Sequence, residues 1–284
     1  MRPWVLGIDL GARYTRALLL GGDGAVRGRG QVESGAFFAR AAEGASEAAL
    51  REAGLERSEL SYAASTGYGR SQVPWRDLQV TELTCHAAGA LRLFPRTRTV
   101  IDVGAQNTRV MSITPEGRVA RFMMNDKCAA GAGRFLERCA AALEVPLGEL
   151  GTRALTAREP QPISSVCAVL AESEVINLVS QELPIEEILL GVHHSICDRV
   201  MTIVRQTGFE PEITLTGGMV HNPAMIRVLS ERLDTTLNVV PDGEYAGALG
   251  AALLGRRRHD RRLAEDAPAK APAHGTRLEQ GERT

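Results

Sequence analysis

Two cysteines stand out because each lies where a helix is expected to begin. Cys128 lies in Asn-Asp-Lys-Cys-Ala-Ala-Gly-Ala-Gly-Arg-Phe-Leu (125–136), a turn of small residues that leads into an apolar-periodic helix. Cys167 lies in Ile-Ser-Ser-Val-Cys-Ala-Val-Leu-Ala-Glu (163–172), where the serines can cap the next helix. Helix starts stabilise negative charge through unpaired N–H groups and the helix dipole. The pattern therefore predicts two thiolate ligands of an iron–sulfur cluster.

The number of cysteines indicates how such a cluster would be completed. The five cysteines form no evident disulfide framework, and they are Cys85, Cys128, Cys139, Cys167 and Cys197. A cubane cluster takes four thiolates, and only two of the five lie at small-residue helix starts. A two-fold dimer with the cluster on its axis would supply the missing pair. The alternative is that both are small buried core residues, as Cys139 is expected to be from its place on an apolar stripe.

A duplicated hairpin is the second feature with chemical meaning. An apolar run ends in an aspartate, a glycine follows two residues later, and a second apolar run returns at once, over 4–20 and again over 100–113. The matching pairs, all 93 positions apart, are Asp9 and Asp102, Gly11 and Gly104, Thr15 and Thr108, and Arg16 and Arg109. This constant spacing indicates an internal duplication.

Two facing glycine turns would hold one triphosphate from both sides. Backbone N–H groups can approach phosphate oxygens where no side chain intervenes, and an aspartate at a strand end can hold Mg²⁺ directly or through water. Asp9 and Asp102 are therefore candidate catalytic and magnesium-binding residues, with Gln106 as the candidate to orient the attacking water. The alternative is a purely structural repeat. The candidate phosphate-binding residues are Gly11, Ala12, Thr15, Arg16, Gly104 and Ala105.

A third glycine motif lies near the end of the chain. A buried strand ends in Gly217-Gly218 just before a helix start, where a base or ribose could lie against bare backbone, with Asn222 as a polar contact or a cap. A simple strand-to-helix turn is the alternative. The helix that follows carries Gly247 and Gly250, which permit close packing of another element, and Gly247 is a further candidate cofactor-binding position.

Two histidine and cysteine arrangements are less informative. Cys85 and His86 are adjacent and point to different faces of their helix, so a shared metal site is not expected, and His86 is more simply a polar residue at a helix start. His193 and Cys197 have the i,i+4 spacing of metal ligands, but no further ligand is evident, and core packing is favoured.

Composition excludes several classes of protein. The 284 residues are 44% hydrophobic and 24% charged with a formal net charge of −1, which gives no attraction to nucleic acid or to an anionic membrane. No segment has the length of a membrane span, and the expected compartment is the cytoplasm. The chain is expected to divide into a first lobe (1–98), a second lobe (99–255) and a disordered tail (256–284).

The order of these motifs resembles that of a known superfamily. The two hairpins, the Gly217-Gly218 turn and the helix with Gly247 are similar to the phosphate, adenosine and connecting motifs of the actin, heat-shock chaperone and sugar-kinase ATPases. The cysteine segments are more specific, and they resemble the ATPase subunits of benzoyl-CoA reductase and the activators of 2-hydroxyacyl-CoA dehydratases, over about residues 3–255. The resemblance implies an α/β fold of duplicated ribonuclease H-like (actin-like ATPase) lobes with a central nucleotide cleft.

The same resemblance implies a function and a set of partners. Family members hydrolyse ATP to drive low-potential electron transfer, and the positions matching Cys128 and Cys167 bind half of a [4Fe-4S] cluster that a second subunit completes. It implies Mg²⁺ and ATP or ADP as further cofactors and ferredoxin or flavodoxin as electron donor. The electron acceptor would be a separate CoA-ester reductase or dehydratase. A second copy or a paralogous ATPase subunit would complete the dimer.

Departures from the family pattern, and two other functions, stay open at this point. Members often have Gly-Gly-Gln-Asp and then lysine in the second turn, whereas this chain has Gly104-Ala-Gln-Asn107 followed by Arg109, and Arg16 replaces a lysine in the first turn. The altered turn is compatible with one subunit of a heteromeric pair. The alternatives are a sugar or amino-sugar kinase without a cluster, and a nucleotide sensor that turns over ATP negligibly.

Overall fold

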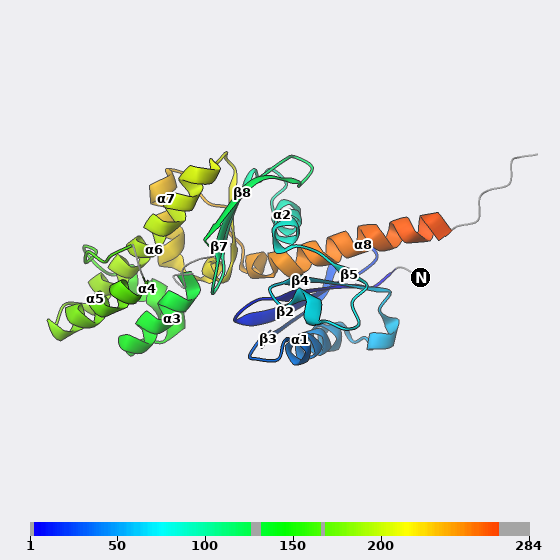
Figure 1. Cartoon of the computed structure of the whole chain (residues 1–284), viewed down its shortest axis with the longest axis horizontal. Coiled ribbons are helices and arrows are strands. Elements are labelled where there is room, and N and C mark those ends of the chain that lie inside the picture. Colours follow the sequence, from blue (N-terminus) through cyan, green and yellow to red (C-terminus); the bar gives the residue numbers. More distant parts are fainter. Residues whose placement is uncertain (1–2, 126–131, 166–167, 267–284) are drawn as a thin grey trace, which may run out of the picture.

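Two β-sheets form the framework of the molecule, and helices pack around and between them (Figure 1). The computed structural model describes residues 3–125, 132–165 and 168–266. The first sheet has the strand order β3-β2-β1-β4-β5, and the second has the order β8-β7-β6-β9. The strands are β1 (Val5–Leu10), β2 (Tyr14–Leu20), β3 (Val26–Glu33), β4 (Tyr62–Gly67), β5 (Leu78–Gln79), β6 (Thr99–Val103), β7 (Thr108–Ile113), β8 (Val119–Asn125) and β9 (Ile213–Gly217).

Both sheets are built on the same antiparallel meander, so the predicted duplication is confirmed. β1 pairs with β2 so that Asp9 lies opposite Arg16, and β6 pairs with β7 so that Asp102 lies opposite Arg109. In each sheet the third strand, β3 or β8, continues the meander on the outer side of the second. Each aspartate therefore lies near the carboxyl end of its strand, next to the glycine turn.

The duplication extends to a parallel strand that the sequence comparison did not reveal. β4 runs parallel to β1, and β9 runs parallel to β6. Each ends in a glycine with positive φ, 93° at Gly67 and 83° at Gly217. Gly67 is the last residue of β4, where it pairs with Leu10 of β1. Since parallel strands align their carboxyl ends, each sheet presents its aspartate and two glycine-containing turns at one edge.

The helices form layers on both faces of each sheet. α1 covers one face of the first sheet, through β1–β3, and α8 covers the other. α2 covers one face of the second sheet, and α6 and α7 contribute to the core on the opposite face. The helices are α1 (Phe38–Ala53), α2 (Glu82–Leu93), α3 (Ala132–Ala142), α4 (Leu150–Ala154), α5 (Ala168–Ser180), α6 (Ile185–Thr207), α7 (Pro223–Leu233) and α8 (Ala246–Asp266).

α8 differs in packing and in length from the expectation, which placed residues 246–255 in the second lobe and 256–284 in a disordered tail. It follows the last strand of the second sheet, yet it packs against β1 and β4 of the first (Figure 1). It also runs to Asp266, so residues 256–266, expected to be the start of a disordered tail, are helical. A helix that is already nucleated extends at low cost, and the i,i+4 ion pairs Arg256–Asp260 and Arg261–Glu265 support the extension. Residues 267–284 lie outside the described residues.

α2 and α8 cross between the two sheets at closely spaced glycines. Gly89 of α2 lies against the backbone of Ala246, and Gly250 of α8 lies against the backbone of Cys85. A Cβ atom on either glycine would overlap the facing main chain. The crossing therefore requires glycine at both positions, and it joins the layer that covers the first sheet to the layer that covers the second.

We expect Gly250→Ala to destabilise the chain by about 3 kcal/mol or more, because backbone atoms cannot yield as a flexible side chain can. The matched control is Gly44→Ala in α1, where an added Cβ would meet Val32 at 3.5 Å, an ordinary contact. That change is expected to be neutral or to stabilise by up to about 1 kcal/mol, since alanine favours helix. Urea unfolding of both variants measures the difference, and equal stabilities would refute the close-packing argument.

Among the described residues, no helix is sufficiently long and apolar to cross a bilayer.

Candidate functional site

A cleft of about 480 Å³ opens where the aspartate-bearing edges of the two sheets face each other. Both glycine turns line it, together with the turn after β9 and the start of α3. The structure brings eleven of the predicted site residues to this cleft, and they are Asp9, Gly11, Ala12, Arg16, Asp102, Gly104, Ala105, Gln106, Gly217, Gly218 and Asn222. The arrangement fits the predicted nucleotide cleft.

Two predicted cofactor-binding residues, Thr15 and Gly247, do not line the cleft. Thr15 is fully buried, and its Oγ1 lies 2.9 Å from Ser34 Oγ, which donates to the carbonyl oxygen of Gly11 at 2.6 Å. Thr15 therefore supports the first turn from behind. Gly247, in α8, lies behind Asp9 and His86, and a Cβ atom there would overlap the Asp9 carboxylate. Its role is to leave room for these two side chains.

The two aspartates have different surroundings despite their equivalent places in the repeat. Asp102 is 2% exposed, and it accepts from Arg109 Nη1 at 2.7 Å and from Thr216 Oγ1 at 3.1 Å. Asp9 has one ion pair among the described residues, with His86 at 3.7 Å. Asp102 is thus neutralised by its own sheet, whereas the Asp9 carboxylate remains available to a cation in the cleft.

The arginines at equivalent positions explain this asymmetry. Arg109 reaches back to Asp102 and also donates to Glu82 Oε2 at 2.7 Å. Arg16 instead turns away from Asp9, and it donates to Gln31 Oε1 at 2.7 Å and to Glu244 Oε2 at 2.6 Å. Arg16 therefore connects β2 to the segment before α8, whereas Arg109 pairs with the aspartate opposite it.

His86 lies between the two carboxylates and links the two repeats. Its Nε2 lies 3.7 Å from Asp9 Oδ2, and its Nδ1 lies 3.3 Å from Asp102 Oδ1 and 3.3 Å from Thr216 Oγ1. Burial by itself lowers the pKa of His86, but the carboxylates of Asp102 and Asp9 outweigh burial and raise this pKa above its ordinary value. For Asp102, burial by itself raises the pKa, but the positive charges of His86 and Arg109 outweigh burial and bring this pKa below its ordinary value. The carboxylate therefore stays ionised.

We expect this arrangement to make the stability of the nucleotide-free chain depend on pH. The pKa of His86 is raised in the folded state. The stability that His86 adds to the folded state is therefore complete below its ordinary pKa of about 6.5, and it is lost as the pH rises through the folded-state pKa. The free energy of unfolding should therefore fall above about pH 6.5, and His86→Gln should reduce that fall. Urea unfolding between about pH 6 and pH 8 measures it.

The control for this experiment is His194→Gln. Burial lowers the pKa of His194, so this histidine contributes a pH dependence of the opposite sign. Removing it should leave the fall above about pH 6.5 in place. An unchanged pH profile in His86→Gln would contradict the proposed pairing with the two carboxylates.

The two glycine turns have the same internal hydrogen bond. Gly11 N–H donates to the Tyr14 carbonyl at 3.1 Å, and Gly104 N–H donates to the Asn107 carbonyl at 2.9 Å. Gln106 is exposed at the tip of the second turn and lines the cleft. Its side-chain amide is therefore accessible to a water molecule in the cleft.

The start of α3 is bonded directly to the second turn. Gly133 N–H donates to the Gly104 carbonyl at 3.3 Å, and Arg134 N–H donates to the Ala105 carbonyl at 2.9 Å. A Cβ atom on Gly133 would lie 2.7 Å from the Cα of Ala105. The helix that follows the Cys128 segment thus rests on a turn that lines the nucleotide cleft.

The turn after β9 has a glycine that the backbone requires. Gly217 has φ 83°, and a Cβ atom there would lie 2.6 Å from the Val103 carbonyl oxygen, whereas Gly218 faces open space. Asn222 caps α7, because its Oδ1 accepts from Met225 N–H at 3.0 Å. Of the two predicted roles for Asn222, the structure therefore shows the cap, at a position that also lines the cleft.

The described cysteines and the His193–Cys197 pair belong to the core. Cys85, Cys139 and Cys197 are fully buried, and burial raises the pKa of each thiol to about 12. His193 bonds to the Leu189 carbonyl at 2.7 Å. Within residues 3–125, 132–165 and 168–266, no group of three or more His, Cys, Asp or Glu could hold a metal ion. Cys128 and Cys167, the predicted cluster ligands, lie outside the described residues.

The sequence did not identify several residues of the cleft. His86 was considered more simply a polar residue at a helix start, and Glu82 and Glu244, which line the cleft, were not singled out. Thr216, which donates to Asp102, was not singled out either. Thr81 caps α2, and this capping residue is a sequence signal that could have located His86 in the second turn of the helix. The signal does not indicate what His86 faces. Only the crossing of α2 over both sheets brings His86 to the two aspartates.

Comparison with known proteins adds independent information. The chain matches the model of the BadF/BadG/BcrA/BcrD ATPase family over residues 6–255. It is 36% identical over 251 residues to the 2-hydroxyisocaproyl-CoA dehydratase activator of Clostridioides difficile, an alignment that covers 88% of this chain and 94% of that protein. It is 37% identical over 238 residues to a subunit of benzoyl-CoA reductase from Thauera aromatica, an alignment that covers 81% of this chain and 84% of that protein.

Solved structures agree with the expected fold. An activator of 2-hydroxyisocaproyl-CoA dehydratase from Clostridium difficile with bound ADPNP has a TM-score of 0.89 at 34% identity, over 94% of this chain and 100% of that chain. A ROK family glucokinase from Streptomyces griseus has a TM-score of 0.55 at 13% identity, over 89% of this chain and 99% of that chain. The kinase shares the fold alone, so the predicted actin-like ATPase architecture is confirmed and the sequence similarity favours the activators.

Proposed function

This chain belongs to the BadF/BadG/BcrA/BcrD ATPase family, and we propose that it uses ATP hydrolysis to deliver low-potential electrons to a CoA-ester dehydratase or reductase. The observation that supports this most directly is the pair of backbone hydrogen bonds from Gly133 and Arg134 to the second glycine turn. They join the nucleotide cleft to the helix that follows Cys128. A change in the turn on hydrolysis would therefore act on that helix without an intervening side chain.

The cleft supplies the groups that ATP and Mg²⁺ would need. The glycine turns would hold the phosphates from both sides. Asp9 would hold Mg²⁺, directly or through water, since Asp102 is already paired with Arg109 and Thr216. Asp102 would act on the ion from a greater distance and keep His86 oriented between the two repeats. Gln106 would orient the attacking water from the tip of its turn.

A [4Fe-4S] cluster would be held by Cys128 and Cys167, with a second copy or a paralogous chain supplying the other two thiolates. The described flanks fit this group. α3 begins at Ala132 and α5 at Ala168, and the two helices pack on each other, with an ion pair between Arg138 and Glu172. The cluster would supply a one-electron carrier, with a ferredoxin or flavodoxin as donor.

Iron analysis tests the proposal. After anaerobic reconstitution we expect about two irons per chain, the share of one protomer in a common cubane. Cys128→Ser and Cys167→Ser should each reduce bound iron to background while nucleotide binding persists, because the cleft is built from other residues. Cys139→Ala is the control and should keep its iron, since that thiol lies in the core. Retention of iron by both serine variants would overturn the cluster assignment.

A further inference from the structure

Arg199, on α6, contacts both chain segments that adjoin the predicted cluster ligands. Its Nε donates to the Ser165 carbonyl at 2.7 Å, and its Nη2 donates to the Ser164 carbonyl at 3.2 Å. Its guanidinium carbon lies 5.1 Å from the ring centroid of Phe135, which is on α3. One side chain thus connects the segment that leads into α5 with the helix that follows residue 131.

Other contacts hold the Ser164 peptide in the same place. Glu174 Oε2, on α5, accepts from Ser164 N–H at 2.6 Å, and Ser195 Oγ, on α6, donates to the Ser164 carbonyl at 2.8 Å. Arg199 Nη2 lies 3.3 Å from Ser195 Oγ as well. The segment therefore has bonds to two helices, and Arg199 is the member of this group that also reaches a third helix, α3.

The chemistry of arginine suits this role. A guanidinium has a planar fork of donors that can bond two successive carbonyl groups, and its flat face stacks on an aromatic ring. Both interactions are present at Arg199. A lysine would keep the positive charge but would lose the fork and the stacking, so the two contributions of this residue can be separated by substitution.

We propose that Arg199 is a positioning residue that fixes the Ser164–Ser165 backbone relative to Phe135, and that its positive charge acts on the electron carrier. The second half of this proposal rests on the proposed function, because the charge matters only if Cys128 and Cys167 hold a cluster. A nearby cation stabilises the reduced, more negative form of an iron–sulfur cluster, so it raises the reduction potential. Arg199 would therefore set both the geometry and the potential of the site.

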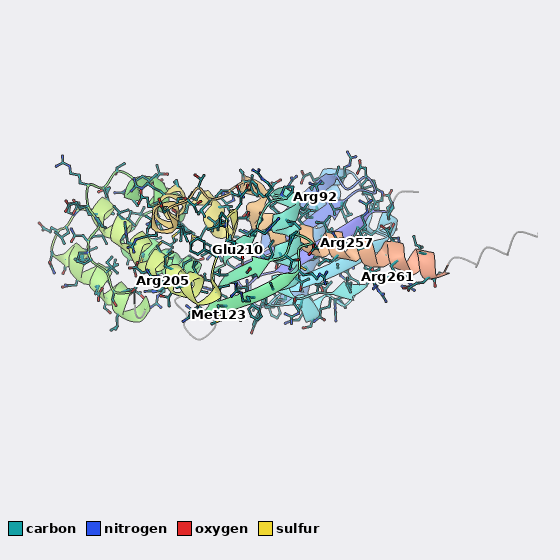
Figure 2. The ribbon with its side chains drawn as sticks, turned by 90° about the horizontal axis from the view of Figure 1, so that it is seen from above. Arg92, Met123, Arg205, Glu210, Arg257 and Arg261 are labelled. Atoms are coloured by element: carbon teal, nitrogen blue, oxygen red, sulfur yellow. The ribbon has the colours of Figure 1, made fainter. Side chains whose placement is uncertain are left out.

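Hydrogen exchange on the cluster-free chain tests the positioning role. In Arg199→Gln we expect the backbone amides of residues 163–165 to exchange about tenfold faster or more, because charge-assisted hydrogen bonds to the segment are lost. Arg199→Lys should show an intermediate increase. The control is Arg205→Gln, an exposed arginine near the end of the same helix (Figure 2), which should leave exchange unchanged. Unchanged exchange in both Arg199 variants would overturn the positioning role.

The reduction potential of the reconstituted chain tests the electrostatic role. Arg199→Gln should shift it to a more negative value than that of the unsubstituted protein, and Arg199→Lys should restore most of the difference. A potential equal in all three proteins would overturn the electrostatic half. If the unsubstituted chain holds no iron, the proposed function fails, and the exchange experiment still decides the positioning role by itself.

Discussion

Asp9→Asn is expected to lower the rate of Mg²⁺-dependent ATP hydrolysis by about 10²–10³-fold, the loss typical of removing one preorganised charge or dipole from a reacting centre. The fold should be unaffected, because the one ion pair of Asp9 among the described residues is the 3.7 Å contact with His86. Steady-state ATP turnover as a function of Mg²⁺ concentration measures the effect. A rate within about threefold of the unsubstituted chain would show that Asp9 does not bind the metal.

Asp102→Asn is the matched comparison, and it should behave differently. It removes one partner from the buried Arg109 guanidinium, which costs about 3–5 kcal/mol in comparable buried pairs. The variant should therefore lose stability as well as activity, whereas Asp9→Asn should lose activity alone. Thermal unfolding without nucleotide distinguishes the two, and equal melting temperatures would contradict the asymmetry of the duplicated site.

Gly133→Ala is expected to weaken nucleotide binding about 5–150-fold. An added Cβ would lie 2.7 Å from the Cα of Ala105, and relieving an overlap of this kind costs about 1–3 kcal/mol. The strain falls on the second glycine turn, since α3 and the turn are joined by backbone hydrogen bonds. Calorimetric titration with ADPNP measures the affinity.

The same variant tests whether the cleft and α3 are coupled. In the unsubstituted chain, ADPNP should protect the first-turn amides of α3 from hydrogen exchange, and Gly133→Ala should lose this protection. The control is Gly148→Ala, which also lines the cleft but has nothing within 4 Å of an added Cβ. It should change affinity less than about threefold. Equal behaviour of the two variants would remove the direct link between the nucleotide turn and the helix.

The sequence by itself determined the repeat and therefore the fold. Asp9 and Asp102 recur at a constant spacing because a strand, a glycine turn and a returning strand are local structures whose residues are adjacent in the chain. The same reasoning located the glycine turn after β9 and the helices α3 and α5 that follow Cys128 and Cys167. Local motifs are visible in sequence because each obeys its own backbone and hydrogen-bonding requirements.

Tertiary structure alone decided which charges meet. Arg16 and Arg109 are equivalent in the repeat, yet Arg16 pairs with Glu244 from the segment before α8. Arg109 pairs with Glu82 from α2, as well as with Asp102 opposite it in its own hairpin. His86, also on α2, reaches both aspartates. The contacts with Glu244, Glu82 and His86 join residues far apart in sequence, and no local pattern records them. What distinguishes the two halves of the cleft is therefore the packing of helices between the sheets, which the duplicated strands do not specify.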